Sequence, residues 1–319
     1  MNPQQSTTPE DLTVQLKKLQ EKYAAMGQDL SSYLDGLLYS DYLTYWEYIH
    51  LDTLLSLQTP RTRFKDELVF IIYHQITELY FRLILWELEQ ISQHIHPDEK
   101  FLNERLTRII RYFRNLEFSF DIMTEGMEKE QFLKFRMALL PASGFQSAQY
   151  RLIEIMATDM INLISPDRQH LIRNPDDVDE MLDHLYWRKG ATELATGQKT
   201  LTLRQFEEKY METFRQTGKK YRLTNLYQIY RKHYAGNAVI IEKLRAFDTL
   251  ANVLWPLAHL KSAGKYLHKD PEDIKATGGT NWQKYLPPRF QKIIFFPDLW
   301  SAAEKEAWGS AAFVQKATL

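Results

Sequence analysis

Two histidines lie on apolar stretches of helical character, each four residues after an aromatic side chain. His74 follows Phe70, and His259 follows Trp255. Residues four apart share one face of an α-helix, so each imidazole and its aromatic partner point the same way. A histidine on such a face is either a hydrogen-bonded core residue or a functional one, and the spacing alone leaves both interpretations open.

An arginine and a threonine have the chemistry to bind a negatively charged group. Arg136 lies four residues after Phe132 on an otherwise apolar helix face, where a desolvated guanidinium needs an anionic partner. That partner is either a nearby glutamate or the carboxylate of a substrate. Thr277 precedes two consecutive glycines, which allow backbone N–H groups to approach an anion closely.

The residue types present narrow the possible metal chemistry. The chain has no cysteine, which removes disulfides, zinc ribbons, iron–sulfur clusters and thiolate ligation of haem. A di-iron site in a helical bundle needs two Glu-x-x-His pairs, and the sequence has one, Glu47 and His50. The motifs of zinc proteases, P-loop proteins, dinucleotide-binding folds and serine hydrolases are also absent.

The composition favours long helices joined by few loops. Glycine and proline number 12 each among 319 residues, which is too few for the many turns of a β-sandwich or barrel. The net charge of −1 leaves no electrostatic footprint for nucleic acid or anionic lipid. Charged residues interrupt the most apolar stretch, so we expect no membrane span and a soluble, cytoplasmic protein.

Helical periodicity and capping residues predict the elements that must position these side chains. Thr8 and Pro9 begin an amphipathic helix that runs on as an arm to about residue 41. A polar stretch with two prolines, 165–177, begins an inserted helical segment that ends at about residue 220. The fold class is therefore all-α. The other expected helices cover 66–96, 98–120, 128–140, 144–164 and 221–267.

Several segments, in order along the chain, resemble the tryptophan 2,3-dioxygenase family. The resemblance covers about 42–300 and implies a helical haem-binding bundle of the tryptophan and indoleamine dioxygenase type, with residues 42–319 as the catalytic haem domain. The segments that carry it are LTYWEYIHLDTLLS (43–56), ELVFIIYHQITELYFRLIL (67–85), FRMALLPASGFQSAQYRLIE (135–154), WPLAHL (255–260), TGGT (277–280) and FFPDLW (295–300).

The resemblance assigns roles around a haem b cofactor and the co-substrate O2. His259 matches the family's proximal ligand of the haem iron, with Trp255 beside it. Ser143 and Gly144 match the loop on the distal side of the haem. The absence of cysteine agrees with a histidine as the axial ligand.

The resemblance also assigns the substrate, L-tryptophan, and its product, N-formylkynurenine. His74 matches the distal histidine that faces the indole N–H, with Phe70 and Phe132 in the same pocket. Arg136 matches the clamp of the substrate carboxylate, and Thr277 matches a loop residue at the amino-acid end of the substrate. The family further implies a homotetramer whose N-terminal arms exchange. Residues of one subunit then complete a neighbour's pocket, namely Tyr45, Tyr48 and Ile49.

Three departures from the family pattern keep alternatives open. Phe132 stands where the family often has tyrosine, Pro256 precedes His259 by three residues, and the loop reads TGGTNW where TGGSSG is typical. Proline lacks an N–H, so it would start or kink the helix that carries His259. The alternatives are a related haem enzyme that oxygenates a modified indole or another aromatic amino acid, and a helical haem sensor without enzymatic activity.

Overall fold

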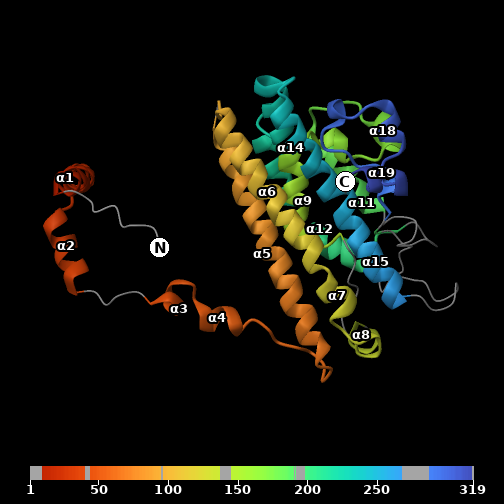
Figure 1. Cartoon of the computed structure of the whole chain (residues 1–319), viewed down its shortest axis with the longest axis horizontal. Helices are drawn as coiled ribbons and strands as arrows, with labels where there is room; N and C mark the ends of the chain where they lie inside the picture. The colour runs from red at the N-terminus through yellow and green to blue at the C-terminus, as the bar shows by residue number, and fades with distance from the viewer. Residues whose placement is uncertain are drawn as a thin grey trace. The chain divides into compact units, whose positions relative to one another are not determined.

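A computed structural model describes residues 9–39, 44–94, 96–136, 145–189, 191, 198–267 and 287–317. These residues form helices and connecting loops, with no β-strand among them (Figure 1). An isolated bridge pairs Ile164 with Leu185. The all-α prediction is confirmed for the part of the chain that the structure describes.

The chain divides into two compact units, 1–57 and 58–319. The first unit contains α1 (Pro9–Ala25), α2 (Leu30–Tyr39), α3 (Tyr45–Tyr48) and α4 (Leu51–Leu55). The predicted arm is not one continuous helix, because Gly27 adopts a φ of 69°, in the left-handed region that ends α1. The Asp29 carboxylate then accepts hydrogen bonds from the backbone of Ser31 and Ser32, which begins α2.

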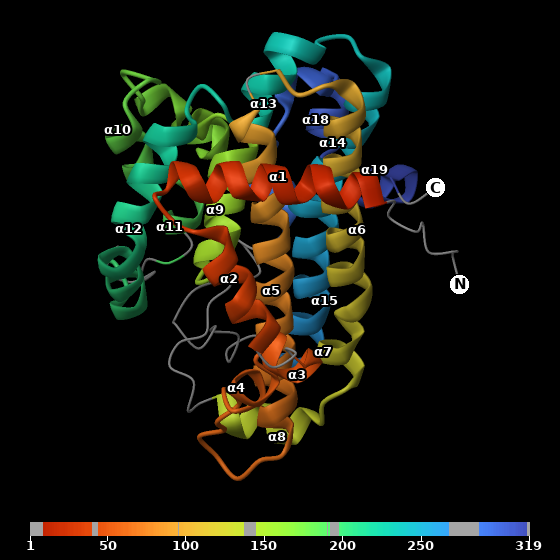
Figure 2. The ribbon, with the colours of Figure 1, turned by 90° about the vertical axis from the view of Figure 1, so that its left-hand side faces the viewer.

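The second unit is built around two long helices, α5 (Asp66–Gln93) and α6 (Glu99–Ser119), which pack against each other (Figure 2). Asp98 caps α6 by accepting a hydrogen bond from Phe101 N at 2.8 Å. The buried face of α5 includes Tyr73, Phe81 and Leu88. By length and composition alone α5 also qualifies as a membrane-crossing helix, as core helices of soluble proteins do.

The apolar positions that reveal the period of α5 in the sequence mostly lie on its exposed face. Six of them, three or four residues apart along the 28-residue helix, are each at least 38% exposed. This exposed α5 stripe consists of Leu68, Ile72, Ile76, Leu79, Leu83 and Trp86. Contiguous apolar surface of this kind is typical of an interaction site.

Shorter helices complete the bundle. They are α7 (Asp121–Glu125), α8 (Lys129–Phe135) and α9 (Ala148–Ala157). The helix expected over 144–164 is shorter than predicted, because the chain becomes extended at Thr158 and continues as a 3-10 turn, Met160–Leu163. α9 packs against α5.

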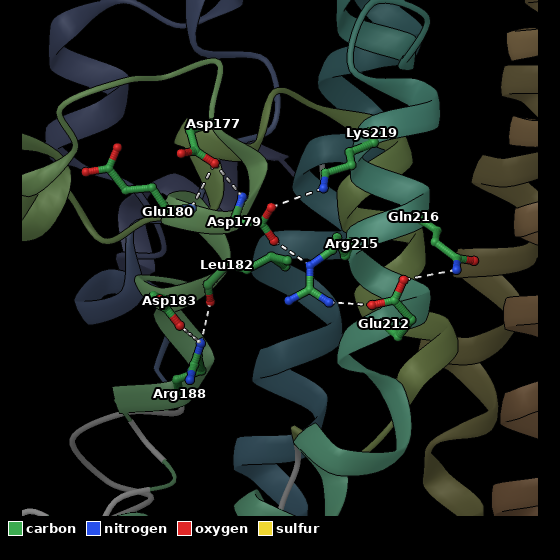
Figure 3. A network of polar contacts seen from close by, with 10 residues as sticks. All are labelled: Asp177, Asp179, Glu180, Leu182, Asp183, Arg188, Glu212, Arg215, Gln216 and Lys219. Atoms are coloured by element: carbon green, nitrogen blue, oxygen red, sulfur yellow. Dashed lines mark hydrogen bonds and ion pairs between the residues drawn. The ribbon is translucent and has the colours of Figure 1, made fainter.

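The described part of the segment predicted at 165–220 consists of helices joined by loops. It comprises a 3-10 helix (Pro166–Leu171), α10 (Val178–Asp183), α11 (Tyr186–Lys189) and α12 (Leu201–Tyr221). Asp179 of α10 forms ion pairs with Arg215 and Lys219 of α12, the second at 3.1 Å (Figure 3). These surface pairs join α10 to α12 while apolar residues supply the core between them.

The region expected as a helix over 221–267 is a run of helical pieces. It includes α13 (Leu226–Ile229), a π turn (Tyr230–Tyr234), α14 (Ala238–Thr249), a second π turn (Leu250–Leu254) and α15 (Trp255–Leu267). α14 and α15 both pack against α6.

A buried aspartate anchors the C-terminal part of the second unit to α14. Asp248 accepts hydrogen bonds from Phe295 N, Phe296 N and Trp300 Nε1, all within 3.1 Å. Burial raises the pKa of Asp248 to about 6, against the opposing effect of these donors. The C-terminal elements are α17 (Pro288–Gln291), a 3-10 turn (Pro297–Leu299), α18 (Ala302–Glu306) and α19 (Ala311–Ala317).

Candidate active site

His74 presents one ring nitrogen from the middle of α5. Its Nδ1 lies 2.8 Å from the carbonyl oxygen of Phe70, and its ring lies 4.0 Å from the Phe70 ring. A carbonyl can only accept, so Nδ1 carries the hydrogen and Nε2 keeps its lone pair. By surface area His74 is exposed. The protein atoms around the ring nevertheless desolvate its charged form and lower the pKa of His74, while the negative charge of Glu78 opposes this shift.

His259 repeats this arrangement on α15. Its Nδ1 lies 3.0 Å from the carbonyl oxygen of Trp255, which again leaves Nε2 as the atom with a free lone pair. The ring is edge-on to Trp255, with 4.4 Å between centroids, and 4.6 Å from Phe120. Burial lowers the pKa of His259 to about 4, so the imidazole is neutral at pH 7.

The two histidines belong to one aromatic cluster. Tyr73, the residue before His74, lies edge-on to both the His74 ring at 6.2 Å and the Phe120 ring at 5.8 Å. Phe120 in turn contacts His259. His74 is near enough that a positive charge on it would lower the pKa of His259. The fold therefore brings together two neutral imidazoles, each with Nε2 able to bind a metal or accept a hydrogen bond.

Phe132 extends the same cluster from α8. Its ring lies 6.3 Å from Phe70 and 4.7 Å from Tyr266. Arg136 is the C-terminal cap of α8, one helical turn after Phe132, and is half-buried. Desolvation lowers the pKa of Arg136, which remains a cation at pH 7. The sequence-predicted residues Phe70, His74 and Phe132 therefore meet in one place.

Other predicted site residues are not joined to this cluster by the structure. Ser143, Gly144 and Thr277 lie outside the described residues. Tyr45 and Tyr48 belong to the first unit, where they are 71% and 73% exposed, and Ile49 beside them is half-buried. Their predicted role in a neighbour's pocket stays a prediction.

Sequence reasoning missed several residues of the cluster. Tyr73 and Phe120 link the two histidines, and Tyr266 contacts Phe132 from α15. The hydroxyl of Tyr266 donates to the carbonyls of Thr124 and Met127, which fixes its ring. Tyr73 directly precedes His74, but no sequence spacing relates Phe120 to His259, so only packing shows this contact.

The residues present fit a haem. Metal-bound histidines commonly donate the second ring N–H to a backbone carbonyl, and His259 does so. Its neutral ring, its aromatic neighbours and the absence of cysteine suit a histidine that would hold a haem iron. Among the described residues, no three histidine, aspartate or glutamate side chains cluster as metal ligands. A cavity of about 150 Å³ between α6 and α14, lined by Thr107, Arg111 and Glu242 among others, contains none of the cluster residues.

The fold and the site define an all-α protein in which two neutral histidines lie among aromatic side chains. Comparison of the sequence with known protein families identifies the family of this chain. The chain matches the sequence profile described as tryptophan 2,3-dioxygenase over residues 35–254, and it belongs to that family. The family consists of dioxygenases, so the protein is an enzyme of the oxidoreductase class. The matched range includes His74, Phe132 and Arg136 and ends just before Trp255.

Curated relatives extend the similarity along most of the chain. The tryptophan 2,3-dioxygenase of Anaeromyxobacter dehalogenans is 29% identical over 281 residues, covering 84% of this chain and 97% of the relative. That of Ruegeria sp. is 27% identical over 277 residues, covering 82% and 92%. A shorter match to the enzyme of Herpetosiphon aurantiacus reaches 42% identity over 120 residues, covering 37% of this chain and 46% of the relative.

Proposed function

We propose that this protein is a haem-dependent dioxygenase that cleaves the indole C2=C3 bond of L-tryptophan with O2 to give N-formylkynurenine. Both atoms of O2 enter the product, so the reaction needs no further reductant. The observation that carries the proposal is the pairing of His74 and His259, each with Nδ1 bound to a carbonyl and Nε2 available. Family membership supports the reaction type.

His259 is the residue that would hold the haem iron, through Nε2. Its hydrogen bond to Trp255 O fixes the tautomer and the ring orientation. Trp255 and Phe120 flank the ring, and Ser143 and Gly144 would contact the cofactor. Haem, when bound, supplies the redox-active iron that activates O2.

The remaining cluster residues would bind and orient the substrate. His74 Nε2 can accept a hydrogen bond from the indole N–H, because its Nδ1 already donates to Phe70 O. Phe70 and Phe132 provide aromatic faces for the indole ring. Arg136 would form a bidentate, charge-assisted pair with the carboxylate, and Thr277 would contact the amino-acid end. Catalysis by these residues is mainly positioning.

The exposed α5 stripe and the apolar side chains of the first unit support a homotetramer. The stripe spans most of α5, and Leu37, Leu38 and Tyr39 of α2 are each at least 70% exposed. Surfaces of this size and character are costly in water unless another subunit covers them. In the proposed assembly the N-terminal arm crosses to a neighbour, and Tyr45, Tyr48 and Ile49 complete that neighbour's pocket. We propose that the enzyme acts in the cytoplasm.

Absorption spectroscopy and product analysis test the proposed function. The purified protein, reconstituted with haem, should show a Soret band whose position shifts on reduction and again on adding L-tryptophan. Under ¹⁸O2 in place of air, with the iron reduced, it should release a product that contains two ¹⁸O atoms, identified by mass spectrometry. A protein that binds haem but leaves tryptophan unchanged would exclude the proposed reaction.

A second candidate is a related oxygenase that acts on a modified indole or another aromatic amino acid. Phe132 favours it, because this side chain lacks a hydroxyl and packs on Tyr266 in the cluster that would receive the substrate ring. A panel of substituted tryptophans, phenylalanine and tyrosine discriminates the two candidates by kcat/KM. A haem sensor would bind the cofactor and convert none of the panel.

A further inference from the structure

The helix that carries His259 begins immediately after a π turn. In that turn the N–H of Trp255 bonds to the carbonyl of Leu250, five residues earlier. The same pattern would pair the carbonyl of Ala251 with the N–H of residue 256. That residue is Pro256, which has no N–H to donate. Ala251 is fully buried, so an unpaired carbonyl here would be costly.

A side chain from another helix supplies the missing donor. The hydroxyl of Tyr150, on α9, donates to the carbonyl oxygen of Ala251 at 2.7 Å. Burial raises the pKa of Tyr150 well above its ordinary value, so the hydroxyl keeps its proton. The Tyr150 ring is itself fixed, because it lies 5.3 Å from Phe81, which is edge-on to Trp255 at 6.0 Å.

We propose that Tyr150 is a positioning residue for His259, because its hydroxyl replaces the backbone donor that Pro256 lacks and thereby holds the first turn of α15. That turn supplies the Trp255 carbonyl to which His259 Nδ1 donates, so the orientation of the imidazole depends on it. Tyr150 and Pro256 therefore act as a pair. The inference rests on the proposed role of His259 as haem ligand.

A double-mutant cycle tests the pairing. Tyr150→Phe removes only the hydroxyl and leaves the Ala251 carbonyl without a donor, whereas Pro256→Ala restores a backbone N–H. In the protein that keeps the native Pro256, Tyr150→Phe should raise the rate of amide hydrogen exchange over 253–262, measured without haem, by about tenfold or more. It should weaken haem binding by a similar factor. In the Pro256→Ala background, both effects should fall below about threefold.

The iron–histidine stretching band of the ferrous protein separates positioning from general stability. Tyr150→Phe should broaden or shift this band, and the double variant should restore it. The matched control is Tyr234→Phe, since Tyr234 also donates its hydroxyl to a backbone carbonyl, that of Pro97, away from the cluster. This control should leave the band unchanged in both backgrounds.

Each outcome either supports or overturns the pairing of Tyr150 with Pro256. Equal effects of Tyr150→Phe in the two backgrounds, or no effect in either, would overturn the pairing. If Tyr150→Phe fails to fold while the double variant folds, the pairing is supported by rescue. A wild-type protein that binds no haem would instead reject the proposed function, and the exchange measurements would still decide whether Tyr150 and Pro256 are coupled.

Discussion

The imidazoles of His74 and His259 lie near enough for a positive charge on His74 to lower the pKa of His259. They come from α5 and α15, helices far apart in the sequence of the second unit, and are linked through Tyr73 and Phe120. Each ring donates Nδ1–H to the carbonyl four residues before it. The pair therefore offers two Nε2 lone pairs, one for a metal and one for a substrate N–H.

Replacing His259 by alanine should remove haem from the protein. Loss of a hydrogen-bond partner of a ligand histidine already costs 10–100-fold in metal affinity, so loss of the ligand should cost more than about 100-fold. The Soret band measured in a haem titration reports this. His94→Ala is the matched control, because His94 has the same Nδ1 contact, 2.8 Å from Gln90 O, at the exposed end of α5. Full haem retention in His259→Ala would refute the assignment.

The stability of the haem-free protein should fall as the pH is lowered from about 6.5 to 4. The pKa of His259 is about 4 in the folded chain and about 6.5 when unfolded, so in this range the unfolded state binds more protons. The contribution of neutral His259 to the free energy of unfolding is fully present above pH 6.5, and about 3 kcal/mol of it is lost by pH 4. Urea unfolding of wild type and His259→Gln at several pH values isolates the contribution of His259 to this pH dependence. Identical pH dependence in the two proteins would contradict the prediction.

Replacing His74 by alanine should lower activity without abolishing it. The change removes one orienting hydrogen bond to the indole N–H, at a cost of about 1–3 kcal/mol in kcat/KM. N1-methyltryptophan cannot donate this bond, so it should be a poor substrate whose turnover responds less to the substitution. Complete inactivation with haem and fold intact would make His74 an obligatory base instead.

Replacing Arg136 by alanine should reduce kcat/KM for tryptophan by well over tenfold. A bidentate guanidinium–carboxylate pair is stronger than a neutral hydrogen bond, which contributes roughly 0.5–1.5 kcal/mol. Indole analogues without the carboxylate should be affected far less. Lys134→Ala removes a cation from the same helix, where Lys134 Nζ lies 5.8 Å from the Phe64 ring centroid, and should be nearly neutral. Equal losses with both kinds of substrate would show that Arg136 is structural.

Deleting residues 1–49 should lower the oligomeric mass and weaken tryptophan binding together. Loss of the aromatic contacts proposed for Tyr45 and Tyr48 should reduce affinity by about tenfold, since such a pair contributes up to about 1.5 kcal/mol. Haem binding should be retained better, because His259 lies outside the deleted segment. Light scattering and a tryptophan titration measure the two effects. Unchanged tryptophan affinity would rule out a shared pocket, whatever the oligomeric state.

The sequence by itself determined the local parts of the site. Helical spacing places Phe70 beside His74 and Trp255 beside His259, and the structure confirms both contacts. The starts of α5 near Asp66 and of α6 near Asp98 were likewise predictable. Pro256 was expected to start or kink a helix, and α15 begins at Trp255. These features depend on hydrogen bonds and side-chain contacts within four or five residues, which the order of residues specifies directly.

Only the tertiary structure decided which of these local pairs meet and what their chemistry becomes. Phe120, at the C-terminal end of α6, contacts His259, and Tyr150 of α9 donates to Ala251, although each pair is more than 100 residues apart in the sequence. The lowered pKa of His259 has the same origin, since desolvation depends on the protein atoms around the ring and not on its neighbours in sequence. Packing likewise buried one face of α5 and left the exposed α5 stripe uncovered. This helix has apolar residues on more than one face, and the neighbouring helices determine which of these residues are buried.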